Sequence, residues 1–189
     1  MPTIDLGYMD AHSLNFGGPL TLSTADILTQ SGTFGGEDCL INFDATTKVL
    51  TIDGIIKVTS LNISTDITYA GKGTIYVTGT TNIGGHVLPG TAASYPTTNV
   101  LGVVSTGNMA LPSSSQKLLT GAFYSAGTIT SNKQNELAGT IVCQNFNITA
   151  QVPKIWQVPS LATNLPPGMP GATPVWVFTK KTWREITKD

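Results

Sequence analysis

The fold of this chain is decided by the stretch Gly54-Ile-Ile-Lys-Val-Thr-Ser-Leu-Asn-Ile63, whose pattern returns four more times. Each copy is a short β-rich run, a small or polar corner and a second β-rich run. Aligned on Val58, Val77, Ser105, Ser125 and Cys143, the copies lie about 19, 28, 20 and 18 residues apart, which is typical of solenoid repeats. The later copies are Gly73-Thr-Ile-Tyr-Val-Thr-Gly-Thr-Thr-Asn-Ile83, Leu101-Gly-Val-Val-Ser-Thr-Gly-Asn-Met109, Gly121-Ala-Phe-Tyr-Ser-Ala-Gly-Thr-Ile129 and Gly139-Thr-Ile-Val-Cys-Gln-Asn-Phe-Asn-Ile148.

The alternation within each copy predicts which side chains face the core. An inward Val or Ile is followed by an outward Thr, Asn or Lys, as in a strand with one buried face. Stacked strands place equivalent residues about 4.8 Å apart, so β-branched side chains pack well inside and glycines suit the corners. We therefore predict an all-β fold, a single-stranded right-handed parallel β-helix (β-solenoid).

The length of 189 residues suits one domain, which we expect to span the whole chain. We predict irregular or capping rungs over 1–47 and regular rungs over 48–150, with an insertion loop at 84–99. Prolines dominate the remainder, 151–189, so we expect an extended segment that packs on the solenoid's flank. Within it, Val175-Trp-Val-Phe178 looks like a final strand.

Composition excludes several classes of partner. Only 11% of residues are charged, the net charge is -1 and the Lys and Arg residues are scattered, which argues against nucleic-acid binding. No apolar run approaches the roughly 20 residues of a membrane helix, so no membrane span is expected in this chain.

No pattern of reactive side chains points to catalysis. The two histidines, His12 and His86, lack metal-ligand spacing and are expected to be exposed in loops. The carboxylates do not share a column of the repeat, as a polysaccharide-active solenoid enzyme would require; they are Asp44, Asp53, Asp66 and Glu136. We predict no catalytic, cofactor-binding or metal-binding residues and no enzyme activity. An outward Thr column that could bind ice is interrupted at Ala126 and Gln144.

Recognition is expected in the loop at 84–99, because loops on repeat scaffolds often carry binding residues. Within it we select Val87, Leu88 and Tyr95 as candidate recognition residues. The two cysteines, Cys39 and Cys143, fit small buried hydrophobic positions better than a disulfide, although a bond between them remains open.

Several motifs, taken in order, resemble the C-terminal β-solenoid region of bacterial PilX-type pilus assembly proteins and related surface proteins. They are Ile67-Thr-Tyr-Ala-Gly-Lys-Gly-Thr-Ile75, Gly121-Ala-Phe-Tyr-Ser-Ala126, Leu137-Ala-Gly-Thr-Ile141, Val152-Pro-Lys-Ile-Trp-Gln-Val-Pro-Ser-Leu161, Leu165-Pro-Pro-Gly168 and Thr182-Trp-Arg-Glu185. Such proteins typically carry an N-terminal hydrophobic anchor helix. None is visible here, so we expect either the extracellular portion of such a protein or a relative without the anchor.

The resemblance implies a non-catalytic structural or adhesive module, associated with type IV pili or the cell envelope and located at the cell surface or outside the cell. Its expected partners are pilus or cell-envelope proteins and, as an option, surface glycans. One alternative is a bactofilin-like subunit whose solenoid ends stack into filaments. A polysaccharide-active β-helix enzyme is a further, less favoured alternative.

Overall fold

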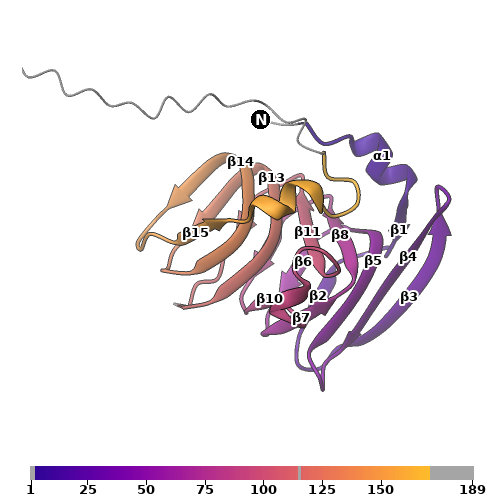
Figure 1. Cartoon of the computed structure of the whole chain (residues 1–189), viewed down its shortest axis with the longest axis horizontal. Helices are drawn as coiled ribbons and strands as arrows, with labels where there is room; N and C mark the ends of the chain where they lie inside the picture. The colour runs from indigo at the N-terminus through magenta and orange to yellow at the C-terminus, as the bar shows by residue number, and fades with distance from the viewer. Residues whose placement is uncertain (1–2, 115, 171–189) are drawn as a thin grey trace, which may run out of the picture.

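The computed structural model describes residues 3–114 and 116–170, and their fold is a β-solenoid of about five turns (Figure 1). Strands make up 54% of the structure, and in the described residues all strand pairs except β3–β4 and β4–β5 are parallel. The predicted all-β solenoid is therefore confirmed.

Parallel strands stack in three runs along the solenoid. The first run follows the order β1 (Ser13–Asn15), β5 (Val49–Val58), β8 (Lys72–Val77), β11 (Val100–Ser105), β13 (Leu118–Ser131), β14 (Glu136–Ile148) and β15 (Lys154–Gln157). The second contains β2 (Leu20–Leu22), β6 (Leu61–Ile63), β9 (Thr81–Ile83), β12 (Met109–Ala110) and the later halves of β13 and β14. The third joins the start of β5 to β7 (Ile67–Ala70) and β10 (Val87–Pro89).

The register of the first run matches the sequence repeat residue for residue. Val58 lies opposite Val77, Val77 opposite Ser105, Ser105 opposite Ser125, and Ser125 opposite Cys143. A one-residue slip would turn every inward side chain outward, so the inward Val, Ile and Ser positions fix this register.

The core is a ladder of apolar side chains in the same strands. Ile56, Ile75, Val103 and Phe123 form one inward column, and none is more than 1% exposed. In the fifth position of this column Ile141 is only half-buried, because no strand among the described residues pairs with it on the outer side of β14.

Glycine is required where neighbouring rungs approach most closely. Gly139 has φ +147°, and a Cβ there would lie 1.9 Å from the carbonyl oxygen of Gly121. Only a residue without a side chain can occupy this position.

The first 47 residues contain more regular structure than the expected irregular or capping rungs. Asp5 caps a short helix, α1 (Leu6–Ala11), by accepting a hydrogen bond of 2.9 Å from the Tyr8 N–H. An antiparallel hairpin of β3 (Ile27–Phe34) and β4 (Glu37–Asp44) then pairs with β5. A six-residue helix leaves too little periodicity to be recognised in a sequence.

Within residues 151–170, the Pro-rich segment first adds β15 to the stack and then packs on the flank. Leu161, in the 3-10 helix η2 (Pro159–Thr163), is buried against Val100 and Ala122. The Thr74 hydroxyl donates a hydrogen bond of 2.6 Å to the carbonyl oxygen of Pro167. The final strand predicted at 175–178 lies outside the described residues.

Candidate functional site

The structure corrects the predicted recognition loop at 84–99. Val87 and Leu88 belong to β10, which pairs with β7, and Val87 also lies opposite Leu119 of β13. Val87 is fully buried in the core, and Leu88 is half-buried. The sequence predicts a loop here because the apolar run is short and contains a proline, yet three residues suffice for one solenoid strand.

Tyr95 does lie outside the strands, but it holds the chain to the rungs. It follows the 3-10 helix η1 (Ala92–Ser94), and its hydroxyl donates a hydrogen bond of 3.3 Å to the carbonyl oxygen of Ala138. Burial raises the pKa of Tyr95 to about 12, although a hydrogen bond involving the Gly121 backbone partly opposes the shift. Tyr95 therefore ties this segment to the neighbouring rungs.

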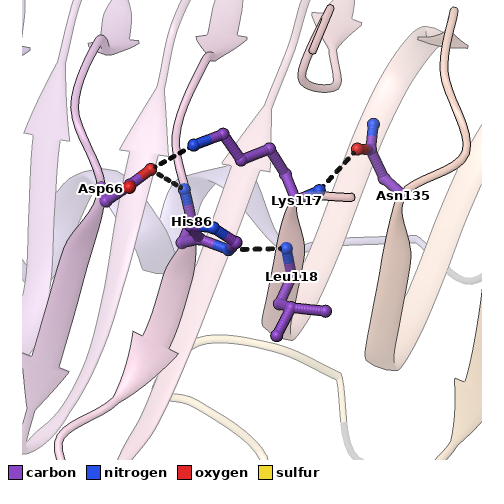
Figure 2. A network of polar contacts seen from close by, with 5 residues as sticks. All are labelled: Asp66, His86, Lys117, Leu118 and Asn135. Carbon is purple, nitrogen blue, oxygen red and sulfur yellow. Dashed lines mark hydrogen bonds and ion pairs between the residues drawn. The ribbon is translucent and has the colours of Figure 1, made fainter. Parts of the chain in front are cut away.

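A polar network joins residues that immediately precede four strands (Figure 2). One carboxylate oxygen of Asp66 accepts hydrogen bonds from the His86 backbone N–H at 2.8 Å and from Lys117 Nζ at 2.7 Å. His86 Nδ1 accepts the Leu118 N–H at 2.9 Å, so the neutral ring carries its proton on Nε2. The Lys117 N–H donates to Asn135 Oδ1 at 3.1 Å.

The electrostatics of this network favour an ionised Asp66. Burial alone would raise its pKa, but the hydrogen bonds from Lys117 and His86 and the charge of Lys117 outweigh it, so the pKa of Asp66 lies below its ordinary value. Asn135 is 1% exposed, and its amide also donates to the Pro112 carbonyl oxygen at 2.8 Å. Because these partners satisfy one another, the network ties successive rungs together and presents no activated nucleophile.

The sequence predicts an exposed loop histidine at His86, whereas His86 is half-buried and lies directly before β10. One feature of the sequence does indicate the network: Asp66, His86 and Lys117 each directly precede a strand of the repeat. Cys39 is buried, Cys143 is half-buried, and both are free cysteines.

The sequence also did not reveal how the stack ends. Its last two strands, β14 and β15, pair with each other and are called the terminal rung; they lie at the end of the stack opposite the β3–β4 hairpin (Figure 1). β15 pairs only with the first four residues of β14, from Glu136 to Gly139. Along residues 140–148, the outer edge of β14 has no partner strand among the described residues.

Apolar side chains are exposed on the terminal rung. Ile148 is 42% exposed, Ile155 47% and Trp156 58%. Beside them, a shallow hollow of about 1060 Å³ lies over the open end of the core, and none of its lining residues is charged. Burial raises the pKa of the Cys143 thiol in this hollow, although a hydrogen bond involving the Ile129 backbone partly opposes the shift.

A smaller hollow of about 530 Å³ lies on the second run of strands and is lined mainly by uncharged polar side chains. Asn82 Nδ2 donates a hydrogen bond of 2.9 Å to Asn62 Oδ1 there, and Thr80 and Asn108 lie at the same surface. Amide and hydroxyl groups of this kind can hydrogen-bond neutral polar ligands.

Within the described part of the chain, no three His, Cys, Asp or Glu side chains are grouped so that they could hold a metal ion. The helices in these same residues all lack the length and apolar character needed to cross a membrane.

No protein-family model matches the sequence, and no curated protein matches it either. Among solved structures, the fold is similar to the crystal structure of the competence-associated pilin ComZ from Thermus thermophilus, with a TM-score of 0.60 and 19% sequence identity. The match covers 89% of this chain and 38% of the pilin chain, so this chain corresponds to well under half of that protein. At this identity the similarity shows a shared fold.

Proposed function

We propose that this chain is a non-catalytic structural or adhesive module associated with type IV pili or the bacterial cell envelope, displayed at the cell surface or outside the cell. The observation that carries the proposal is the fold similarity to a competence-associated pilin. The sequence resemblance to PilX-type proteins supports the same role, with pilus or cell-envelope proteins as partners.

The architecture suits a spacer or a display surface. Each interior strand of the first run, such as β8 or β11, has a parallel partner on both sides, which leaves open strand edges only towards the ends. Each rung gains stability from its neighbours, so such a stack holds its shape along its whole length. In the described residues, the ionisable groups of the Asp66 network are engaged in joining rungs.

Surface glycans are the second class of partner in this proposal, and the hollow beside Asn62 and Asn82 is where we expect them to bind. Its uncharged amides and hydroxyls match the hydroxyl groups of neutral sugars. A glycan array with the wild-type chain and an Asn82→Ala variant tests this part. Binding that is weakened by the substitution supports it, whereas no bound glycan refutes it.

The location of the protein tests the proposed function directly. Pili are sheared from cells of the source organism, purified and probed with an antibody against this chain, beside a matched strain that cannot assemble type IV pili. We expect the protein in the sheared pilus or envelope fraction, with loss of the pilus-bound portion in the mutant strain. Recovery only from the cytoplasmic fraction of both strains would refute the proposal.

A filament-forming solenoid remains the alternative because β14 has an open parallel edge. The opposite end carries an antiparallel hairpin, so the two ends are not interchangeable stacking surfaces. Light scattering across a concentration series separates the two functions. A monomer at all concentrations favours the display module, and growing filaments favour the alternative.

A further inference from the structure

The chain contains two histidines, and their rings make opposite kinds of hydrogen bond. His12 Nδ1 lies 2.9 Å from the Tyr8 carbonyl oxygen, which can only accept, so this nitrogen carries a proton and donates it. His86 Nδ1 lies 2.9 Å from the Leu118 backbone nitrogen, whose N–H can only donate, so this ring nitrogen is unprotonated. The two rings should therefore respond differently to acid.

Protonation of the rings breaks only one of these two bonds. A histidine ring ordinarily gains its second proton between about pH 8 and pH 5, and both ring nitrogens are then donors. The bond from His12 to the Tyr8 carbonyl oxygen is retained, because Nδ1 is already the donor there. The bond from Leu118 to His86 is lost, because two N–H groups would otherwise face each other across 2.9 Å.

The bond to His86 lies where the contact between two strands is short. His86 directly precedes β10, and Leu118 is the first residue of β13. These two strands share one aligned residue pair, Val87 with Leu119. The hydrogen bond from Leu118 to the His86 ring extends this contact by one residue, at the point where the chain enters β13.

The charged groups near the ring come from neighbouring turns and from β14 (Figure 2). Asp66, before β7, accepts hydrogen bonds from the His86 backbone N–H at 2.8 Å and from Lys117 Nζ at 2.7 Å. One rung further on, Glu136 pairs with Lys154 at 2.9 Å. Despite some burial, Lys117 and His86 lower the pKa of Asp66, and Lys154 lowers that of Glu136. Both carboxylates therefore stay charged while a histidine gains its proton.

The entry into β13 has other bonds that do not involve the ring. Asn135 accepts the Lys117 N–H at 3.1 Å and donates to the Pro112 carbonyl oxygen at 2.8 Å. The ion pair between Lys117 and Asp66 is also independent of the imidazole. Loss of the bond to His86 should therefore loosen the start of β13 without unfolding the rung.

We propose that His86 is an acid-sensitive latch between two rungs. The neutral ring holds the first residue of β13 against the start of β10. A proton taken up from solvent on Nδ1 removes the hydrogen bond from Leu118 and frees this end of β13, while the Lys117–Asp66 ion pair persists to lower pH. This corner of the stack is consequently most rigid when His86 is neutral.

Nuclear magnetic resonance of the full chain tests the latch. Protonation of the His86 ring and exchange of the Leu118 amide are followed together from about pH 7.5 to about pH 5. The protection factor corrects for the intrinsic pH dependence of amide exchange. We expect that of Leu118 to fall about fivefold as the ring becomes charged, the change that corresponds to one lost hydrogen bond. Amides in the middle of β8 and β11 should keep their protection.

His86→Asn is the matched control, because the oxygen of its side chain can accept the Leu118 N–H in the place of Nδ1 and does not titrate. We expect the Leu118 protection factor of this variant to be the same at both ends of the pH range. His12→Gln should keep the loss of protection seen in the wild type.

Leu118 protection that stays constant while the His86 ring gains its proton would overturn the proposal. An equal loss of protection in the wild type and in His86→Asn would also overturn it, because the acid-sensitive group would then lie elsewhere. The wild-type titration decides the question even where a variant fails to fold. It reads a single backbone amide, so its result is independent of the proposed pilus-related role.

Discussion

The buried Tyr69 and the half-buried Tyr95 differ in a single hydrogen bond. The Tyr69 hydroxyl is buried without a hydrogen-bond partner among the described residues, and burial raises the pKa of Tyr69 far above its ordinary value. The Tyr95 hydroxyl has the Ala138 carbonyl oxygen as its acceptor. An unsatisfied buried hydroxyl destabilises the folded state, whereas a satisfied one contributes modestly.

Removing the two hydroxyls should therefore change stability in opposite directions. We expect Tyr69→Phe to raise the free energy of unfolding by about 1 kcal/mol and Tyr95→Phe to lower it by about 1 kcal/mol. Urea denaturation of the two variants and the wild type measures both changes. A loss of stability in Tyr69→Phe as large as that in Tyr95→Phe would show that Tyr69 has a partner.

Gly139 should tolerate no side chain. A Cβ there would lie 1.9 Å from the Gly121 carbonyl oxygen, and φ is +147°. We expect Gly139→Ala to lower the free energy of unfolding by about 3 kcal/mol or more, because both backbone strain and a shift of the rung are required. Gly18→Ala is the matched control, since nothing lies within 4 Å of its Cβ position. Similar denaturation midpoints for the two variants would contradict the close approach of the rungs.

Single residues also show what the sequence could and could not predict. The column from Val58 to Cys143 was predicted correctly because the core selects small and β-branched residues at a fixed position of the repeat, four residues after a glycine in four of the five copies. The strand at Val87 is not predicted, because the three residues Val87–Pro89 are too few to show alternation. Packing between distant rungs decides which of Val87, Leu88 and Tyr95 is accessible. A single sequence does not show that packing.

Among the elements, the turns before β7, β10 and β13 are joined through Asp66. The pKa of Asp66 is lower in the folded state than its ordinary value, so the unfolded chain binds the proton more tightly. The stabilisation is therefore fully present above the ordinary carboxyl pKa and is lost as the pH falls through the folded-state pKa. The Asp66 side chain is 47% exposed, so solvent screening limits the contribution to about 1 kcal/mol or less.

Asp66→Asn should consequently destabilise the protein at pH 7 by up to about 1 kcal/mol, and the difference from the wild type should shrink as the solution becomes more acidic than pH ~4. Denaturant titrations of both proteins between pH 7 and pH 3 measure this difference. Glu136→Gln is a parallel case, because the hydrogen bond from Lys154 at 2.9 Å also lowers the pKa of Glu136, so its difference from the wild type should shrink on acidification as well. A difference for Asp66→Asn that grows on acidification would contradict the assigned ion pair.

The elements at the two ends were the hardest to predict from the sequence. Interior strands repeat the same pattern, so each copy supports the assignment of the others. The β3–β4 hairpin and α1 occur once, and their form is set by packing against β5 rather than by a repeat. For the same reason, the sequence did not show that the edge of β14 is left open beyond Gly139.

The whole molecule is a stack in which each rung contacts mainly the next. Strand pairs along the first run connect β1 to β15 without interruption, while the hairpin and the terminal rung lie at opposite ends (Figure 1). In such a linear array, local opening should begin at the ends, where a strand has one neighbour instead of two. The display function that we propose depends on this continuous, rigid middle.

Hydrogen exchange across the full chain, measured by mass spectrometry under native conditions, tests this continuous stack most directly. The slowest exchange is predicted for β8 and β11, which are paired on both sides, with faster exchange in the outer hairpin strand β3 and in β15. Protection that is greatest in β3 and β4, or equally weak in all strands, would contradict the stack of parallel rungs.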